Sequence, residues 1–351
     1  LNKNSPNSES QNAFLNSFHS KVLDAYSKLF IVGESITAEI LKNRIFGVGQ
    51  SVNTLIHIVT EHNNMFEKRI GKDYSYGSFK NYKTTAKYLA EFIPYQYNKS
   101  DLPIEEIKYS FCEHYYAYLT QVKPCNVNGA NKHIQRLKKI VNYAFKMGYV
   151  NTNALLSYSL KFDRFIQQKL TWEDIEKLQA YKPHNSTLEK ILDVFLFQCF
   201  TGLAYSDVKK LSYEHTSEGA DKQKWISMER TKTKTTFTVP ILKPAQDIMD
   251  KYRLSEKDDN KRVFPVISNQ KMNDGLKIIG EIAGIKKNLS SHVGRHTFAT
   301  TVTLQEGVPI ETVSKLLGHT KISTTQIYSV VTQLKVSRDM EEIIQKHKNK
   351  L

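Results

Sequence analysis

Apolar residues recur at a helical spacing along most of the chain, which indicates a mainly helical protein. In residues 1–71 this pattern predicts helices over 14–30, 35–46 and 52–70. Residues 1–10 are polar, so we expect them to be frayed. The first part of the chain is therefore predicted to be a helical N-terminal segment.

A second helical unit is predicted over residues 72–157. Apolar positions at helical spacing place its helices over 78–92, 104–119 and 130–147. We interpret the stretch that follows, 158–170, as an interdomain linker. The linker separates this helical unit from the rest of the chain.

The third unit, residues 171–337, combines helices with a short sheet. Thr171 with Asp174 three residues later predicts a capped helix start. The strongly apolar run 190–201 predicts a buried helix, and the basic run 224–241 predicts a β hairpin. We therefore expect a mainly α protein, in which a helical bundle precedes a mixed, mostly helical α/β unit with a small antiparallel sheet.

Charge adds a first functional indication. The 351 residues carry a formal net charge of +15 and a pI near 9.4. A basic protein of this kind often binds a polyanion, and nucleic acid is the leading candidate. Neither an apolar run of about 18 residues nor a signal peptide is visible, so we expect no membrane span.

The cysteines and the first residue bear on compartment and completeness. The three cysteines, Cys112, Cys125 and Cys199, form no C-x-x-C pair. This argues against a disulfide framework or a structural zinc site, and for a reducing cytosol. The first residue is Leu rather than Met, so we expect a fragment that lacks sequence upstream.

Candidate chemistry concentrates in residues 291–328. His292 and Arg295 are three residues apart, so they share one face of a helix. His292 and His296 also have the i, i+4 spacing of zinc ligands. Val293 stands where a zinc protease has its glutamate, so the metal interpretation lacks a catalytic base.

A second short helix is predicted over 310–317, with His319 in the turn after it. Ser323 and Gln326, three residues apart, form a capping-box pattern. We therefore expect a further helix that begins there and carries Tyr328. Two imidazoles and one guanidinium would then face one tyrosine.

These residues match three parts of one signature. H-x-x-R occurs at His292 and Arg295, L-L-G-H ends at His319, and Tyr328 follows nine residues later. The combination resembles the tyrosine recombinases, also called the phage integrase family. A helical core with incidental histidines would not require these spacings.

The resemblance implies DNA strand cleavage and rejoining through a 3′-phosphotyrosine intermediate, without a cofactor or a metal ion. It implies that Tyr328 is the nucleophile and that Arg295 binds the phosphate oxygens. It also implies that His292 and His319 donate hydrogen bonds to those oxygens, and that one of them helps to deprotonate the tyrosine.

The family places its general acid, a lysine, on a hairpin. Lys232 matches, because it precedes Thr233 and lies eight residues before Pro240. Lys234 is the competing candidate, and either lysine would also serve as a phosphate contact without proton transfer. The resemblance therefore assigns the acid to this hairpin and leaves Lys234 open as an alternative.

One position departs from the family pattern T-G-x-R-x-x-E/D. Here residues 201–203 are followed by Ala204, and Asp207 stands in the acidic place. The missing arginine puts full catalytic competence in question. We expect Arg230 to substitute, because it lies two residues before Lys232 on the predicted strand and so faces the same side. Lys190 is the second candidate, and a contact to a phosphate other than the scissile one is the alternative role for Arg230.

The resemblance is strongest to integrases of bacterial conjugative transposons, which recombine DNA core sites as homotetramers through a Holliday junction. Two alternatives stay open: a DNA invertase with the same chemistry, and an architectural DNA-binding protein that lost cleavage with the arginine at Ala204. We expect the protein to act in the cytoplasm, associated with the nucleoid.

The flanking segments have expected roles as well. Residues 1–71 resemble the helical part of a domain that binds arm DNA sites, with a plain packing segment as the alternative. A terminal helix within 338–351 would dock onto a neighbouring protomer, and an accessory DNA-bending protein is a further expected partner. The expected DNA contacts are basic residues of the second unit and the hairpin: Lys80, Lys83, Lys87, Lys132, Arg136, Lys139 and Lys234.

Overall fold

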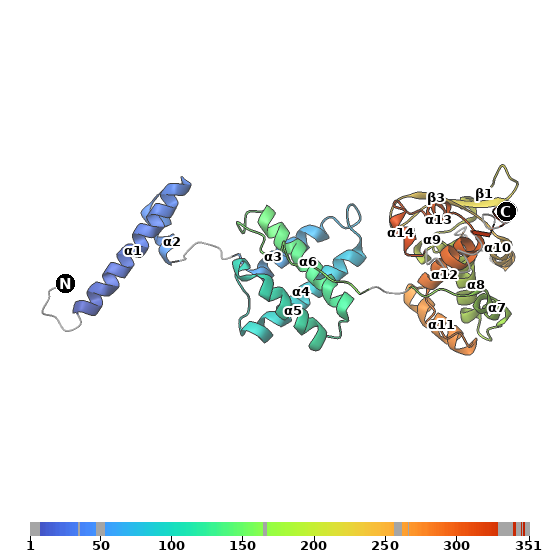
Figure 1. The fold of residues 1–351 in the computed structure, drawn as a ribbon, viewed down its shortest axis with the longest axis horizontal. Coiled ribbons are helices and arrows are strands. Elements are labelled where there is room, and N and C mark those ends of the chain that lie inside the picture. Colours follow the sequence, from blue (N-terminus) through green and yellow to red (C-terminus); the bar gives the residue numbers. More distant parts are fainter. Residues whose placement is uncertain are drawn as a thin grey trace. The chain divides into compact units, whose positions relative to one another are not determined.

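A computed structural model gives the architecture as two compact units, Leu1–Arg164 and Phe165–Leu351, each with its own hydrophobic core (Figure 1). The structure describes residues 8–33, 36–46, 53–163, 167–255, 262–265 and 267–328, together with 340, 341, 345 and 347. Most of the predicted terminal helix within 338–351 therefore lies outside the described residues. No helix in the described part of the chain is long and apolar enough to cross a bilayer.

The chain begins with two helices that pack on each other, α1 (Ser8–Val32) and α2 (Ala38–Phe46). Ala25 and Leu29 of α1 are buried. Because α1 begins at Ser8, the expectation that residues up to 10 are frayed was wrong for the last three of them, while residues 1–7 lie outside the described part.

The second group of helices forms a bundle around one core: α3 (Leu55–Glu67), α4 (Tyr76–Tyr97), α5 (Tyr109–Gln121) and α6 (Val127–Lys146). Leu55, Ile58 and Phe66 of α3 are buried in this core. The boundary expected at 71/72 had assigned this helix to the preceding segment. Its apolar face instead packs against α4 and α6.

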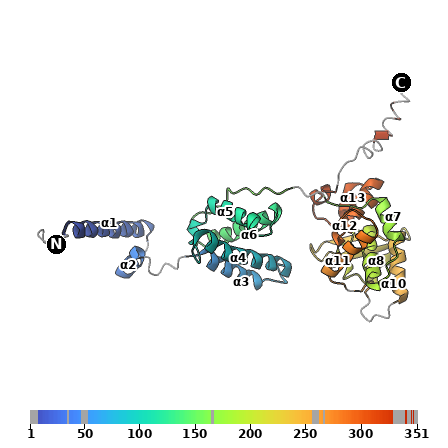
Figure 2. The ribbon, with the colours of Figure 1, turned by 90° about the horizontal axis from the view of Figure 1, so that it is seen from below.

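The second of the two compact units, Phe165–Leu351, contains the predicted third unit of the sequence. It is built around α8, whose apolar run is buried as predicted. Neighbouring helices contact it on several sides (Figures 1 and 2). The α-helices in the described part of this unit are α7 (Trp172–Ala180), α8 (Ser186–Thr201), α9 (Tyr205–Val208), α10 (Lys243–Ser255), α11 (Asn269–Ile282), α12 (Ser291–Thr297), α13 (Ile310–Leu316) and α14 (Ser323–Gln326). The predicted capping box of Thr171 and Asp174 is present at the start of α7.

The Gln198 side chain provides the buried polar contact that joins α12 to α8. The Gln198 side chain of α8 donates to the Leu203 carbonyl and accepts from the Ser291 hydroxyl, both at 3.0 Å. Gly294 allows a close approach of α12 to α8, because a Cβ there would lie 3.1 Å from the Gln198 Cβ. Helix α12 therefore has a defined position against the central helix.

A small antiparallel sheet completes the unit, with β1 (Thr216–Glu218), β2 (Lys224–Glu229) and β3 (Thr236–Pro240) in that order. The hairpin of β2 and β3 was predicted, and β1 was not. Glu229 pairs with Thr236 at the end of the ladder. Residues 230–235 are therefore a loop, and the expectation that Arg230 lies on a strand was wrong.

Candidate active site

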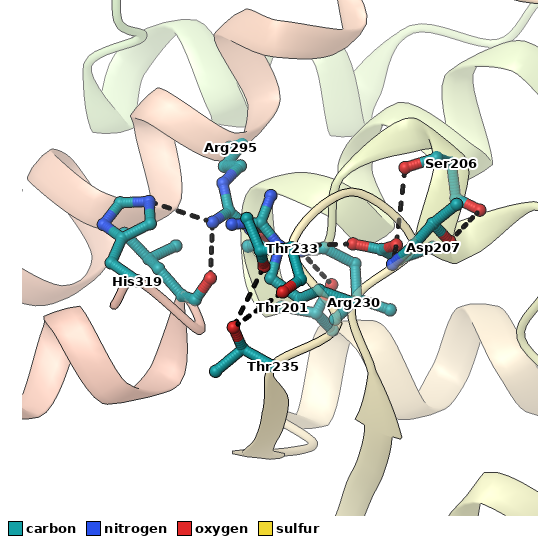
Figure 3. A network of polar contacts seen from close by, with 12 residues as sticks. Thr201, Ser206, Asp207, Arg230, Thr233, Thr235, Arg295 and His319 are labelled. Carbon is teal, nitrogen blue, oxygen red and sulfur yellow. Dashed lines mark hydrogen bonds and ion pairs between the residues drawn. The ribbon is translucent and has the colours of Figure 1, made fainter. Parts of the chain in front are cut away.

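Arg295 is anchored by the ends of two other helices. The residue is 3% exposed, and its guanidinium donates to the carbonyls of Gly202 and Leu317, each at 2.6 Å (Figure 3). These carbonyls belong to the C-cap residues of α8 and α13, and the C-terminal end of a helix carries partial negative charge. These two hydrogen bonds therefore hold the buried cation of Arg295 in a fixed position.

His319 completes this contact. Its Nε2 lies 3.2 Å from Arg295 Nη2, and its Nδ1 lies 2.8 Å from Thr325 Oγ1. A guanidinium only donates, so Nε2 is the acceptor and Nδ1 carries the proton of the neutral ring. Burial, followed by the charges of Arg295 and Arg230, lowers the pKa of His319 to about 4. His319 is therefore neutral at neutral pH, with its lone pair facing the arginine.

Arg230 reaches the same place from the hairpin loop. It is 8% exposed, and its Nε lies 3.7 Å from Asp207 Oδ2. Gly318 makes room for it, because a Cβ there would lie 2.7 Å from Arg230 Cδ. The same glycine has a φ of +61° where α13 ends. One glycine therefore serves the helix end and the passage of Arg230.

The two guanidinium groups lie between His319 and Asp207 (Figure 3). Burial, with the nearby charge of Arg230, lowers the pKa of Arg295 to about 10. Asp207 is 1% exposed, and its Oδ1 accepts from the Thr231 backbone N–H at 2.9 Å. Its carboxylate therefore holds the hairpin loop. Two buried cations with one buried anion leave a positive site that suits an anion.

Tyr328 lies beside these groups. It is 5% exposed, and its ring stacks on that of His319 with centroids 6.2 Å apart. Burial raises the pKa of Tyr328, while the charge and hydrogen bonding of Arg295 oppose this. The tyrosine proton therefore needs an acceptor before its oxygen can act as a nucleophile.

The local structure around Tyr328 differs from the prediction. Helix α14 begins after Ile322, whose backbone is already helical, and Ser323 makes no capping hydrogen bond. The capping box expected of Ser323 and Gln326 was therefore wrong. Tyr328 follows the helix in a turn, where its N–H donates to the Thr325 carbonyl at 2.9 Å.

His292 and Ala204 face a cavity of about 300 Å³ that Arg295 also lines. His292 is exposed, and Lys232 is exposed on the hairpin loop. Partial desolvation, together with the charges of Arg295, Lys232 and Arg230, lowers the pKa of His292. The space that Ala204 leaves is therefore open and lies next to candidate phosphate contacts. Polar residues absent from the sequence-based site complete its lining: Tyr205, Ser206, Asn269, Asn273, Ser290 and Ser291.

The remaining candidates are placed as follows. Lys234 has a left-handed backbone, with a φ of +57°, and its Nζ lies 3.5 Å from Glu229, so it pairs within the hairpin. On α4 and α6 of the first unit, Lys80, Lys83, Lys87, Lys132 and Lys139 are exposed. Arg136 is half-buried, and desolvation lowers its pKa.

A groove in the first unit contains basic residues beyond those predicted. Its volume is about 790 Å³, and Lys138, Lys139 and Lys146 of α6 are in its lining. The signal for Lys138 was visible in the same basic run of α6. Asn269 and Asn273, which line the cavity beside His292, gave no sequence signal, because α11 and α12 meet only in the fold.

Comparisons with known proteins agree with this architecture. The phage integrase SAM-like domain matches residues 54–161, and the phage integrase family matches residues 168–334. The tyrosine recombinase XerA of Pyrococcus furiosus is 28% identical over 221 residues, covering 60% of this chain and 73% of its own. The tyrosine recombinase XerC of Leptospira interrogans is 24% identical over 277 residues, covering 76% and 87%.

Solved structures share the fold. A lambda integrase dimer bound to a COC′ core site superposes with a TM-score of 0.65 at 16% identity, covering 87% of this chain and 85% of the integrase. The Tn1549 transposon integrase in complex with a circular intermediate DNA gives 0.62 at 14% identity, covering 83% and 99%. The predicted fold class is thereby confirmed.

The matched domains cover most of the chain and include helix α12, which carries Arg295, and the turn after α13, which carries His319. The chain belongs to the phage integrase family of tyrosine recombinases. It is a site-specific recombinase, as the sequence motifs indicated.

Proposed function

We propose that the second unit cuts and rejoins DNA with Tyr328 as the nucleophile, and that the protein is the integrase of a mobile element. The observation that carries the proposal is the pair of buried guanidinium groups, Arg295 and Arg230, next to a single buried carboxylate and a tyrosine. Such a site binds an anion of phosphate size and stabilises added negative charge.

The chemical step follows from these groups. The Tyr328 oxygen bonds to the scissile phosphorus, and the bond from phosphorus to the 5′-oxygen breaks. We assign the Tyr328 proton to Nε2 of His319. This nitrogen loses its hydrogen bond from Arg295 when the phosphate takes the Arg295 donors. Lys232 gives a proton to the leaving 5′-oxygen. A 3′-phosphotyrosine results, and reversal by another 5′-hydroxyl rejoins the strand.

Asp207 takes a positioning role in this proposal. Its carboxylate accepts from Thr231 and pairs with Arg230, so it fixes the loop on which Lys232 lies. Arg230 supplies the positive charge that relatives obtain from an arginine at the position of Ala204. No metal ion is required, because guanidinium groups and imidazoles already provide charge and hydrogen bonds.

The wider assembly is proposed by analogy with the relatives. A homotetramer on DNA core sites would exchange strands through a Holliday junction, with the exposed lysines of α4 and α6 along the DNA backbone. Arm sites, an accessory DNA-bending protein and action at the nucleoid in the cytoplasm belong to the same proposal. Inversion by the same chemistry is the alternative outcome of strand exchange.

A suicide substrate tests the proposal. A nicked duplex from the ends of the mobile element loses a short strand after cleavage, so the covalent complex accumulates and is seen on a denaturing gel. We expect an adduct with the parent protein, with and without EDTA. DNA binding without any adduct would favour the architectural alternative that the open space at Ala204 suggests. An adduct that disappears in EDTA and returns with a divalent ion would contradict the mechanism.

A further inference from the structure

His296 is a buried histidine between two groups of the candidate site. It is 2% exposed, and neither ring nitrogen has a hydrogen-bond partner in the described part of the chain. Its ring lies 4.2 Å from the His292 ring, at 73°, and 4.9 Å from the Tyr328 ring, at 55°. The imidazole is thus in ring contact with an expected phosphate contact and with the expected nucleophile.

The surroundings of His296 keep it neutral. Burial, followed by the charges of His292 and Arg295, lowers its pKa to about 3. The neutral ring has one N–H donor and one lone pair. Metal binding is also unsupported, because no group of three metal-ligating side chains occurs among the described residues.

An apolar ring would fill this space without burying unpaired nitrogens, which lower stability. His133 in the first unit shows the ordinary arrangement. It is also buried, and its Nδ1 lies 2.9 Å from Thr85 Oγ1. The imidazole at His296 therefore has donor and acceptor capacity that its packing does not use.

His292 has the matching requirement. To donate one N–H to a phosphate oxygen, a neutral imidazole needs the tautomer with that nitrogen protonated, and the partner of its other nitrogen sets this tautomer. His296 lies one helical turn further along α12, in ring contact with His292. The two rings meet edge to face with centroids 4.2 Å apart. An N–H to N hydrogen bond between them therefore requires a change in χ1 as well as χ2 of one of the two side chains.

We propose that His296 is a positioning residue that donates to His292 and fixes the tautomer in which His292 donates to the scissile phosphate. The proposal rests on the proposed function, in which a phosphate lies beside His292. No proton is lost or gained by either ring. Tyr328 packs against His296, which is 2% exposed, so the donor is kept away from solvent.

The kinetic test removes the nitrogens and then restores a donor. His296→Phe keeps an aromatic ring, while His296→Asn and His296→Gln place an amide N–H near the position of either ring nitrogen. At matched DNA occupancy, we expect His296→Phe to form covalent complex about 10- to 100-fold more slowly. One of the two amide variants should regain at least part of the rate. The melting temperature of His296→Phe should equal or exceed that of the parent, because unpaired nitrogens are gone.

These outcomes separate positioning from packing. If His296→Phe cleaves within about twofold of the parent rate, the nitrogens are dispensable and the proposal fails. If all three variants cleave slowly and melt early, His296 only packs. His133→Phe is the matched control: it removes a paired buried imidazole, so we expect a lower melting temperature and unchanged cleavage by the bound protein.

A second measurement does not depend on cleavage. With ¹⁵N-labelled histidine in a Tyr328→Phe background, the ring nitrogen shifts of His292 report its tautomer in the DNA complex. We expect a single tautomer, and a mixture when His296→Phe is added. The same tautomer populations in both proteins would overturn the inference. Absence of cleavage by the parent would instead count against the proposed function.

Discussion

Removal of Arg230 tests most sharply how this site works with Ala204 in place of an arginine. Arg295 and Arg230 contribute two positive charges and Asp207 one negative charge, so the buried set carries one net positive charge. Arg230→Ala reduces this to zero where the phosphate gains charge. Loss of one such donor typically costs about 10²–10³ in rate, or roughly 3–4 kcal/mol.

The same change also affects stability. Asp207 is 1% exposed, and Arg230→Ala leaves its carboxylate without the cation 3.7 Å away. Breaking a buried pair in this way costs about 3–5 kcal/mol. Adding Asp207→Asn removes the unpaired charge, restores one net positive charge, and keeps an acceptor for the Thr231 N–H. The double variant should therefore melt above Arg230→Ala and cleave faster than it.

Two further variants separate charge from geometry. Arg230→Lys keeps the charge and loses the planar pair of donors, so an intermediate rate is expected. Ala204→Arg in the Arg230→Ala background places a cation in the cavity next to His292 and should recover part of the rate. The assay is single-turnover formation of covalent complex at matched DNA occupancy. If Arg230→Ala cleaves at the parent rate once bound, Arg230 does not replace the missing arginine.

Three other predictions follow from named contacts and charges. Gly318→Ala should slow cleavage and lower the melting temperature more than Gly284→Ala, because both glycines have similar positive φ but only Gly318 lies against Arg230; equal effects would contradict the contact. Stability should fall as pH decreases from 6.5 toward 4, since the pKa values of His133 and His319 are both lowered to about 4 and the unfolded chain takes up protons first; melting temperatures that stay constant over this range would contradict it. DNA affinity should fall steeply between low and physiological salt as phosphate contacts release counterions, and titrations with a nearly flat salt dependence would exclude a DNA clamp based on the +15 charge.

The parts of the fold that sequence predicted are those set by local periodicity. The apolar run of α8 and the capping box at Thr171 depend on residues within a few positions of each other. The motif around His292 and Arg295 was likewise visible, because both lie on one short helix. Such features need no knowledge of distant contacts.

Features that depend on distant contacts were missed. Arg295 is held by the carbonyls of Gly202 and Leu317, which carry no side-chain signal at all. The hairpin turns directly after Arg230, whose N–H and carbonyl bond to Thr235 and Lys234, and the carboxylate of Asp207 holds this turn through the Thr231 N–H. The loop nevertheless brings Arg230 near Arg295, and its role as the substitute stays a prediction.

The turn at Tyr328 shows how local rules fail when tertiary contacts compete. Ser323 and Gln326 have capping-box spacing, yet the chain is already helical at Ile322. Thr325 is buried and hydrogen-bonded to His319, which fixes this helix by a contact outside its own sequence. The position of Tyr328 therefore depends on His319 rather than on a cap.

The central claim is that Tyr328 forms the covalent bond to DNA, and peptide mapping of the trapped complex tests it most directly. After digestion with protease and nuclease, mass spectrometry should find the peptide that contains Tyr328 carrying a nucleotide through its 3′-phosphate. Tyr328→Phe should bind DNA and give no adduct, while Tyr205→Phe, which lacks the hydroxyl bonded to the Ile267 carbonyl, should still give one. A nucleotide found on Tyr205 or Tyr252, or an adduct that persists in Tyr328→Phe, would contradict the account.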